Sequence, residues 1–167
     1  MMELLILLGL KVPDLINILL TYESYEVARD EISRTLDLLE NIHENKEYFK
    51  LRIGSIASFL PRNQPLYAFS CFIIIPSLMA KDVHFRIPHG MKEFFPRLLT
   101  ILNLTDLFPN LVISNLSRTE FLKERTATLT NPHTHEIRSV TDAVIFTGTS
   151  VHADQLRMLF NKETLFI

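Results

Sequence analysis

The residues best suited to bind a ligand lie in the stretch Val140–Ala153, which reads VTDAVIFTGTSVHA. Apolar β-formers at positions 144–146 are followed by Gly148 and by two hydroxyl side chains, Thr149 and Ser150. A strand that runs through a glycine into a helix leaves free backbone N–H groups that can bind a phosphate. The alternative is an ordinary strand–helix turn in which Thr149 or Ser150 caps the helix. The stretch therefore predicts either a phosphate cradle or a capped turn.

Two further motifs lie upstream, LPRNQPL at Leu60–Leu66 and IPSLMA at Ile75–Ala80. Together with FTGTS they resemble the aldehyde dehydrogenase superfamily. In that family a strand ends in a Pro-Trp-Asn-Phe-Pro-like turn, a helix ends near a Pro-Ala-Leu-like step, a strand ends in a basic residue, and a later strand enters Phe-Thr-Gly-Ser. All four elements occur here in that order, between about Leu36 and Ile167. The resemblance implies a three-layer α/β fold with a mainly parallel sheet, a Rossmann-like cofactor domain of aldehyde dehydrogenase type.

The resemblance also implies roles for individual residues. Asn63 matches the asparagine that donates to the developing oxyanion of the substrate, although a turn residue that caps the next helix is the simpler alternative. Arg62 replaces the usual tryptophan, which changes the wall that faces the cofactor. The positions expected to contact the cofactor, NAD or NADP, are Pro61, Arg62, Arg86, Gly148, Thr149 and Ser150.

The basic strand end is assigned by counting along the chain. The family places a lysine there to hold the adenosine ribose. Counting from Asn63 selects Arg86, whereas counting from Pro76 selects Ile87, and we assign Arg86. An arginine fork can donate to a ribose hydroxyl or a phosphate, and the alternative is a surface arginine at a strand end.

Several departures from the family pattern limit the activity that the resemblance implies. Cys71 lies in an apolar segment, so we expect a buried and inert thiol, and it does not match the family's nucleophile. Phe166 stands where hydrolytic members carry a general-base glutamate, which favours a reductase of acyl thioesters. The second glycine of the cradle is replaced by Ala153, beside the bulky His152, which predicts weak or absent cofactor binding.

The resemblance therefore implies the cofactor-domain portion of an NAD(P)-dependent aldehyde or acyl-CoA reductase or dehydrogenase that lacks the catalytic cysteine domain, inactive as an isolated chain. The alternative is a non-catalytic aldehyde-dehydrogenase-like domain used for protein–protein interaction. The expected partner is a complementary catalytic chain or a second copy. The net charge of −2 gives no electrostatic footprint for nucleic acid. The single cysteine excludes an internal disulfide framework and is typical of a cytoplasmic protein.

The elements that position these residues follow from hydrophobic patterning. Residues 1–50 are predicted as an N-terminal helical segment and residues 51–167 as a truncated NAD(P)-binding-like α/β domain. The apolar run Leu4–Leu10 is too short to span a membrane, so we expect it to pack against the protein, with no membrane partner. Ser24–Phe49 is predicted as an amphipathic helix that packs intramolecularly rather than in a coiled coil.

Beyond residue 50 strands and helices alternate, which predicts a parallel sheet. Strands are predicted near Ile53, Val83, Leu111 and Val144, and helices over Pro65–Ile75, Lys92–Leu104 and Val151–Phe160. The first of these helices has a strand as its alternative, because it ends in β-branched residues. Ser117–Arg138 is predicted as a polar loop, in which His133 and His135 lack further ligands, so no metal site is expected.

Overall fold

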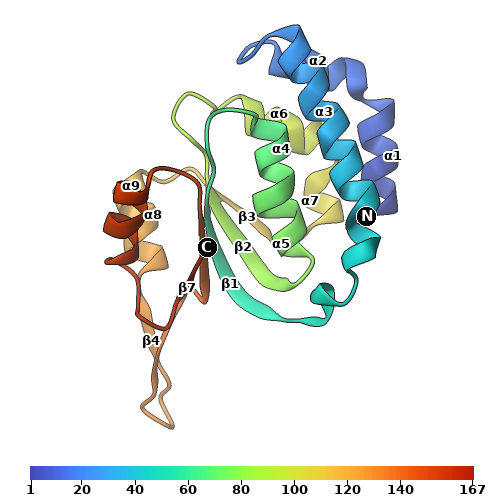
Figure 1. The fold of residues 1–167 in the computed structure, drawn as a ribbon. Coiled ribbons are helices and arrows are strands. Elements are labelled where there is room, and N and C mark those ends of the chain that lie inside the picture. Colours follow the sequence, from blue (N-terminus) through green and yellow to red (C-terminus); the bar gives the residue numbers. More distant parts are fainter.

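The computed structural model describes residues 1–167 as a parallel sheet between two layers of helices (Figure 1). The strands are β1 Ile53–Phe59, β2 Ala80–Arg86, β3 Leu111–Ser114, β4 Thr128–Thr130, β5 Ile137–Ser139, β6 Ala143–Phe146 and β7 Leu165–Phe166. Five of them form one sheet in the order β3-β2-β1-β6-β7, in which every neighbouring pair is parallel. β4 and β5 form a separate antiparallel hairpin that projects from the body of the molecule. The predicted three-layer α/β fold with a mainly parallel sheet is confirmed.

Helices cover both faces of this sheet (Figure 1). The helices are α1 Met2–Leu10, α2 Val12–Leu19, α3 Tyr25–Glu40, α4 Pro65–Phe69, α5 Ile75–Ser77, α6 Phe94–Ile101, α7 Leu104–Leu107, α8 Arg118–Arg125 and α9 Ser150–Arg157. The 3-10 turns are η1 Asn41–Asn45 and η2 Tyr48–Lys50, and a π-helical turn, η3, spans Ser70–Ile74. α1 to α7 lie on one face and α8 and α9 on the other. None of these helices has the length and apolar character that crossing a membrane requires.

Two hydrophobic clusters hold the layers together. The larger cluster has 25 buried residues and joins the helices of residues 1–50 to the sheet. Its members include Leu15, Ile32, Phe69, Phe85 and Phe95. The smaller cluster on the opposite face consists of Ala57, Phe121, Val144, Leu156 and Phe160. The central strands are therefore buried on both faces, as a parallel sheet requires.

The prediction of a polar loop over Ser117–Arg138 is wrong. This segment contains α8 and the β4–β5 hairpin, and only the hairpin tip, with the exposed His133 and His135, is a loop. α8 begins with a capping box, in which the side chains of Ser117 and Glu120 each accept a backbone N–H of the other residue. The Ser-x-x-Glu spacing that marks such a box is present in the sequence.

The predicted buried helix over Pro65–Ile75 is confirmed, and it continues to Ser77. A π-helical turn occupies its centre, just before Pro76. Proline has no N–H to donate to the carbonyl four residues earlier, and a π turn is one way for a helix to accommodate that loss. The β-branched residues that left a strand as the alternative lie in and beside this irregular turn.

Candidate functional site

The sheet has a single topological switch point, between β1 and β6. β2 and β3 extend the sheet on one side of β1, and β6 and β7 extend it on the other. In open α/β sheets, ligands bind in the crevice outside the carboxyl ends of the strands at such a point. The candidate site is therefore the edge at which β1 and β6 end.

The strand register brings the predicted site residues to this edge. Phe59 pairs with Phe146 on one side and with Arg86 on the other, so β1, β2 and β6 end at the same level. The hydroxyl of Thr147 donates to the carbonyl oxygen of Phe59 at 3.2 Å, which ties the turn after β6 to the end of β1. The predicted residues that these strand ends bring to one edge are Pro61, Arg62, Asn63, Arg86, Gly148, Thr149 and Ser150.

The turn after β6 leaves the start of α9 without a side-chain cap. Thr149 occupies the N-cap position, but its hydroxyl does not bond a backbone N–H of the first turn. It lies instead 3.1 Å from Nδ1 of His152. The N–H groups at the start of a helix have no intrahelical partner, so those of α9 are available to an anion.

Gly148 has a local reason to be glycine. A Cβ at this position would lie 2.5 Å from Cζ of Phe146, so any side chain would clash with that ring. The Phe146 ring therefore packs closely against the backbone of Gly148, on the side where a side chain would point. Ala153, in the position of the family's second glycine, lies one turn into α9.

The turn after β1 presents two exposed polar side chains, Arg62 and Asn63. Arg62 reaches across to the loop after β2, where its Nη2 lies 3.3 Å from the point at which Gly90 would carry a Cβ. Gly90 has a φ of +86°, a conformation that favours glycine. Gln64, not Asn63, occupies the N-cap position of α4, and no side chain caps that helix. The alternative prediction, that Asn63 is a turn residue that caps the next helix, is therefore wrong.

Helix α3 holds this turn in place. Nη1 of Arg34 donates to Oε1 of Gln64 at 3.2 Å, and the Arg34 guanidinium stacks on the ring of Tyr67 at 4.1 Å. Oε1 of the buried Glu31 accepts the N–H of Tyr67 at 2.8 Å. Gln64 itself adopts a left-handed conformation with φ of 48°, which these contacts stabilise.

Cys71 does not join the site. It is half-buried rather than fully buried as predicted. Burial raises the pKa of its thiol, while a hydrogen bond from Tyr67 and the charge of Arg34 lower it, and the pKa stays above its ordinary value. These neighbours place Cys71 on the side of its helix that faces α3. The thiol is therefore protonated at neutral pH.

Sequence reasoning missed three cationic or imidazole side chains beside Arg86. His89, Lys92 and Arg118 line the same pocket as Arg86, beyond the ends of β2 and β3. The only sequence feature that pointed to them is their position after the strands, since His89 and Lys92 follow one predicted strand and Arg118 follows the next. Which of these side chains meet depends on the register between β2 and β3.

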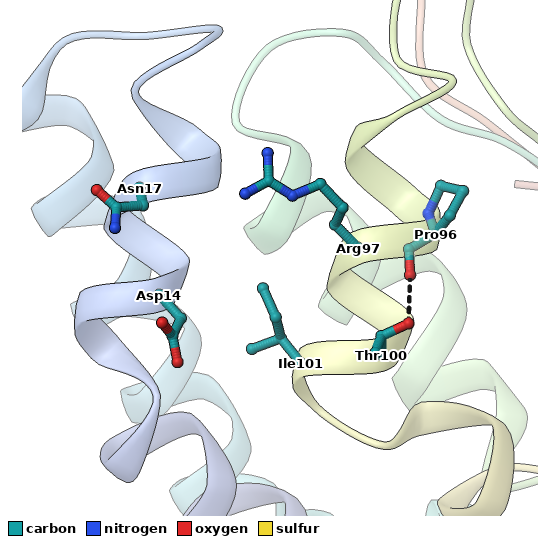
Figure 2. Close-up of a pocket in the computed structure, with 6 residues that line it drawn as sticks. All are labelled: Asp14, Asn17, Pro96, Arg97, Thr100 and Ile101. Atoms are coloured by element: carbon teal, nitrogen blue, oxygen red, sulfur yellow. Dashed lines mark hydrogen bonds between the residues drawn. The ribbon is translucent and has the colours of Figure 1, made fainter.

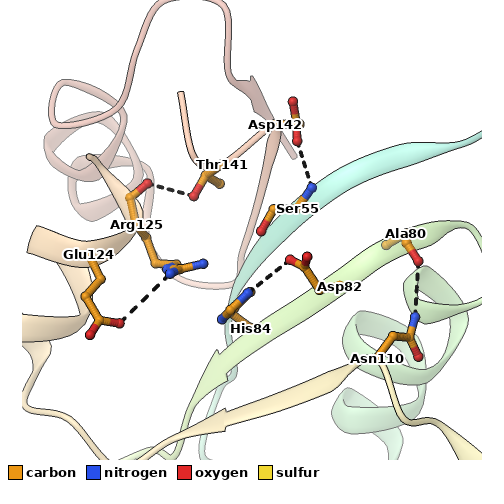
Figure 3. A network of polar contacts seen from close by, with 9 residues as sticks. All are labelled: Ser55, Ala80, Asp82, His84, Asn110, Glu124, Arg125, Thr141 and Asp142. Atoms are coloured by element: carbon orange, nitrogen blue, oxygen red, sulfur yellow. Dashed lines mark hydrogen bonds and ion pairs between the residues drawn. The ribbon is translucent and has the colours of Figure 1, made fainter. Parts of the chain in front are cut away.

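A second polar cluster lies at the opposite edge of the sheet, near the start of β1 and β2 (Figure 3). The Asp142 carboxylate accepts the N–H of Ser55 at 2.7 Å, an approach that only glycine at position 54 permits, since a Cβ there would overlap the carboxylate. The Asp82 carboxylate lies 3.0 Å from Nε2 of His84. Burial and the nearby charge of Arg125 lower the pKa of His84, which makes its imidazole neutral at pH 7.

This cluster contains the residue types of a Ser-His-Asp triad but not its hydrogen bonds. Oγ of Ser55 has no partner, whereas Nε2 of His84 is already directed at Asp82. A serine nucleophile needs an imidazole nitrogen within hydrogen-bond reach to remove its proton. The cluster therefore connects β1 through hydrogen bonds to the segment between β5 and β6, which contains Asp142.

An open groove of about 530 Å³ lies between α2 and α6 (Figure 2). It is lined by Asp14, Asn17, Pro96, Arg97, Thr100 and Ile101. Its one internal hydrogen bond joins the Thr100 hydroxyl to the carbonyl of Pro96 at 3.0 Å, a local helix contact. The groove lies within the helical layer and contains no nucleophile paired with a base, so its size does not make it the functional site.

No protein-family model and no curated protein sequence matches this chain. The resemblance to aldehyde dehydrogenases therefore rests on the four motifs themselves. Three of those motifs, the turn after β1, the basic end of β2 and the turn after β6, lie at the carboxyl edge of the sheet.

Proposed function

We propose that this chain is the cofactor-domain portion of an NAD(P)-dependent aldehyde or acyl-CoA reductase or dehydrogenase. The observation that carries the proposal is the arrangement at the switch point, where the turns that end β1 and β6 leave neighbouring strands. Both turns carry motifs that resemble the aldehyde dehydrogenase superfamily. Doubly wound sheets bind dinucleotides at this position.

The residues at this edge suit a pyrophosphate, although one side chain beside Gly148 restricts its approach. The first turn of α9 has no side-chain cap, and the hydroxyls of Thr149 and Ser150 lie beside it. The ring of Phe146, however, fills the space next to Gly148. We therefore expect the pyrophosphate to bind weakly. It would accept hydrogen bonds from the N–H and hydroxyl groups of the turn without approaching Gly148 closely.

When bound, NAD(P)H supplies the chemistry of hydride transfer to a carbonyl carbon. The chain's own part is to orient the cofactor and to donate a hydrogen bond from the exposed amide of Asn63 to the developing oxyanion. The cysteine nucleophile would come from outside these residues, on a complementary catalytic chain or domain. Cys71 does not suit that role, because burial raises the pKa of its thiol and leaves it protonated at neutral pH.

Phe166 supports the reductase branch of this proposal. Its ring packs 6.5 Å from that of Phe146, and the Arg157 guanidinium lies 6.0 Å above it. An apolar side chain here cannot activate water, which a hydrolytic aldehyde dehydrogenase needs and an acyl-group reductase does not. An acyl thioester is therefore the favoured substrate class.

Calorimetric titration of the full chain with NAD and with NADP tests the proposal. We expect a dissociation constant on the order of 0.1–1 mM for at least one cofactor. Ser150→Glu places a carboxylate in the first turn of α9, where it stabilises the helix but repels a phosphate, so binding should be lost while the fold is kept. Gln155→Glu makes the same charge change on the exposed side of α9 and should leave binding unaltered.

A second candidate is a non-catalytic domain used for protein–protein interaction. The observation that favours it is the open edge of the sheet at β7, where the apolar side chains of Leu165 and Ile167 are 54% and 63% exposed. Absence of heat with millimolar NAD and NADP would reject the cofactor domain and favour this alternative.

A further inference from the structure

A basic pocket of about 360 Å³ lies beyond the carboxyl ends of β2 and β3. Four of its lining side chains are cationic or can become so, namely Arg86, His89, Lys92 and Arg118. None of its lining residues is acidic. A concave site with this charge suits an anion.

The cations of this pocket have no counter-ions within the protein. The three ion pairs of the chain, Lys11–Asp14, Arg34–Asp30 and Arg125–Glu124, all lie elsewhere, as does the contact between His84 and Asp82. Burial, together with the like charge of Arg118, lowers the pKa of Arg86. A bound anion would relieve this repulsion and satisfy both guanidinium groups, which recognise phosphate through paired donors.

The adjacent start of α8 does not supply the anion site. Its capping box uses the Glu120 carboxylate to accept the N–H of Ser117 at 3.0 Å and the Ser117 hydroxyl to accept the N–H of Glu120 at 3.3 Å. The first turn is thus already capped by a side chain of its own helix. Recognition of an anion falls to the basic side chains.

The pocket lies where a dinucleotide would place its adenosine ribose. Arg86 pairs with Phe59 of β1 on one side and with Ser114 of β3 on the other, so the pocket is next to the switch-point crevice. At the end of the second strand of such folds, an acidic side chain selects the free 2′-hydroxyl of NAD, whereas an arginine accommodates the 2′-phosphate of NADP.

We propose that the pocket formed by Arg86, Lys92 and Arg118 binds the 2′-phosphate of NADP(H), so that the chain selects NADP over NAD. The proposal rests on the proposed cofactor-domain function and names its cofactor. Arg118, which follows β3 and was not among the predicted site residues, is the specificity-determining side chain that the structure adds.

The test is a calorimetric titration of the full chain with NADP, NAD, adenosine 2′,5′-bisphosphate, adenosine 5′-monophosphate and inorganic phosphate. Hydrogen bonds to a charged group raise binding affinity by about tenfold to hundredfold, so NADP should bind at least about tenfold more tightly than NAD. Arg118→Ala should remove most of that preference by weakening NADP alone. The exposed Lys123→Ala, on the same helix but outside the pocket, should change neither affinity.

The outcomes separate this inference from the function on which it rests. Equal affinities for NAD and NADP, or an Arg118→Ala variant that weakens both equally, would overturn the 2′-phosphate assignment and leave the cofactor domain standing. Inorganic phosphate that binds as tightly as adenosine 2′,5′-bisphosphate would show that the pocket takes a free anion instead. Absence of binding by either dinucleotide would reject the proposed function and this inference together.

Discussion

Glu31 is the residue whose chemistry departs furthest from what the sequence suggests. In the sequence it is one charge on an amphipathic helix, yet its side chain is completely buried. One oxygen accepts the N–H of Tyr67, while the other lies near Glu23, and a buried oxygen of each carboxyl lacks a donor. A proton shared by the two carboxyl groups accounts for both oxygens. Burial and the contact with Glu23 raise the pKa of Glu31 to about 9.

This pKa predicts that the protein loses stability as the pH rises. Between the ordinary glutamate pKa of 4.5 and about 9, the folded chain keeps a proton on Glu31 that the unfolded chain has released. The free energy of unfolding therefore falls with rising pH across this window. Glu31→Gln keeps an acceptor for Tyr67 and a donor for Glu23 without titrating, so it should be more stable than the wild type at pH 8, by on the order of a few kcal/mol.

Urea denaturation at several pH values between 5 and 9 measures the effect. The Glu31→Gln variant should show a flatter dependence of unfolding free energy on pH than the wild type. Glu31→Ala, which loses the contact with Tyr67 as well, should be less stable than Glu31→Gln throughout. Parallel pH profiles for the wild type and Glu31→Gln would show that Glu31 is ionised in the folded chain.

At the scale of elements, the sequence predicted well wherever a long apolar pattern met a clear end signal. The strands near Ile53, Leu111 and Val144 and the helix after Ser150 lie where the pattern indicated. Boundaries were less reliable, because tertiary contacts override local preference. The helix predicted to reach Phe49 ends at Glu40 and continues as 3-10 turns, and the one predicted from Lys92 starts at Phe94.

α8 was missed because its evidence is polar rather than apolar. The helix buries a single side chain, Phe121, so it has almost no hydrophobic periodicity. Its capping box carries the signal instead. α8 therefore depends more on its N-cap than a helix with a broad apolar face does.

Ser117→Ala should destabilise the protein by about 1 kcal/mol, since the backbone N–H of Glu120 loses the Ser117 hydroxyl that accepts it, while the bond from the Ser117 N–H to the Glu120 carboxylate can remain. For a domain of this size, such a loss lowers Tm by about 2–4 °C. Thr119→Ala, an exposed substitution in the same helical turn, is the matched control and should have little effect. Equal melting temperatures for Ser117→Ala and the wild type would mean that the capping box does not stabilise α8.

For the whole molecule, the sequence predicted the layers and the parallel sheet, and with them the common edge at which the motifs lie. It did not predict which side chains meet there. The pocket shared by Arg86 and Arg118 depends on the pairing of Arg86 with Ser114, a register between strands that no local pattern encodes. The same limit applies to the Glu23–Glu31 pair and to the contact of Arg62 with Gly90.

The open edge of the sheet gives the last prediction, which concerns assembly. β7 pairs only with β6, and the exposed Met158 lines one pocket with Phe166 of this strand. An unpaired, apolar strand edge is a template for another chain, so we expect the 167-residue chain to self-associate in a concentration-dependent manner. Light scattering coupled to size-exclusion chromatography measures this self-association.

Leu165→Lys should return the chain to a monomer, because a charge at this edge opposes strand pairing, whereas Leu129→Lys on the exposed hairpin should not. A monomeric wild type at every concentration, or equal effects of the two substitutions, would show that β7 is not the contact.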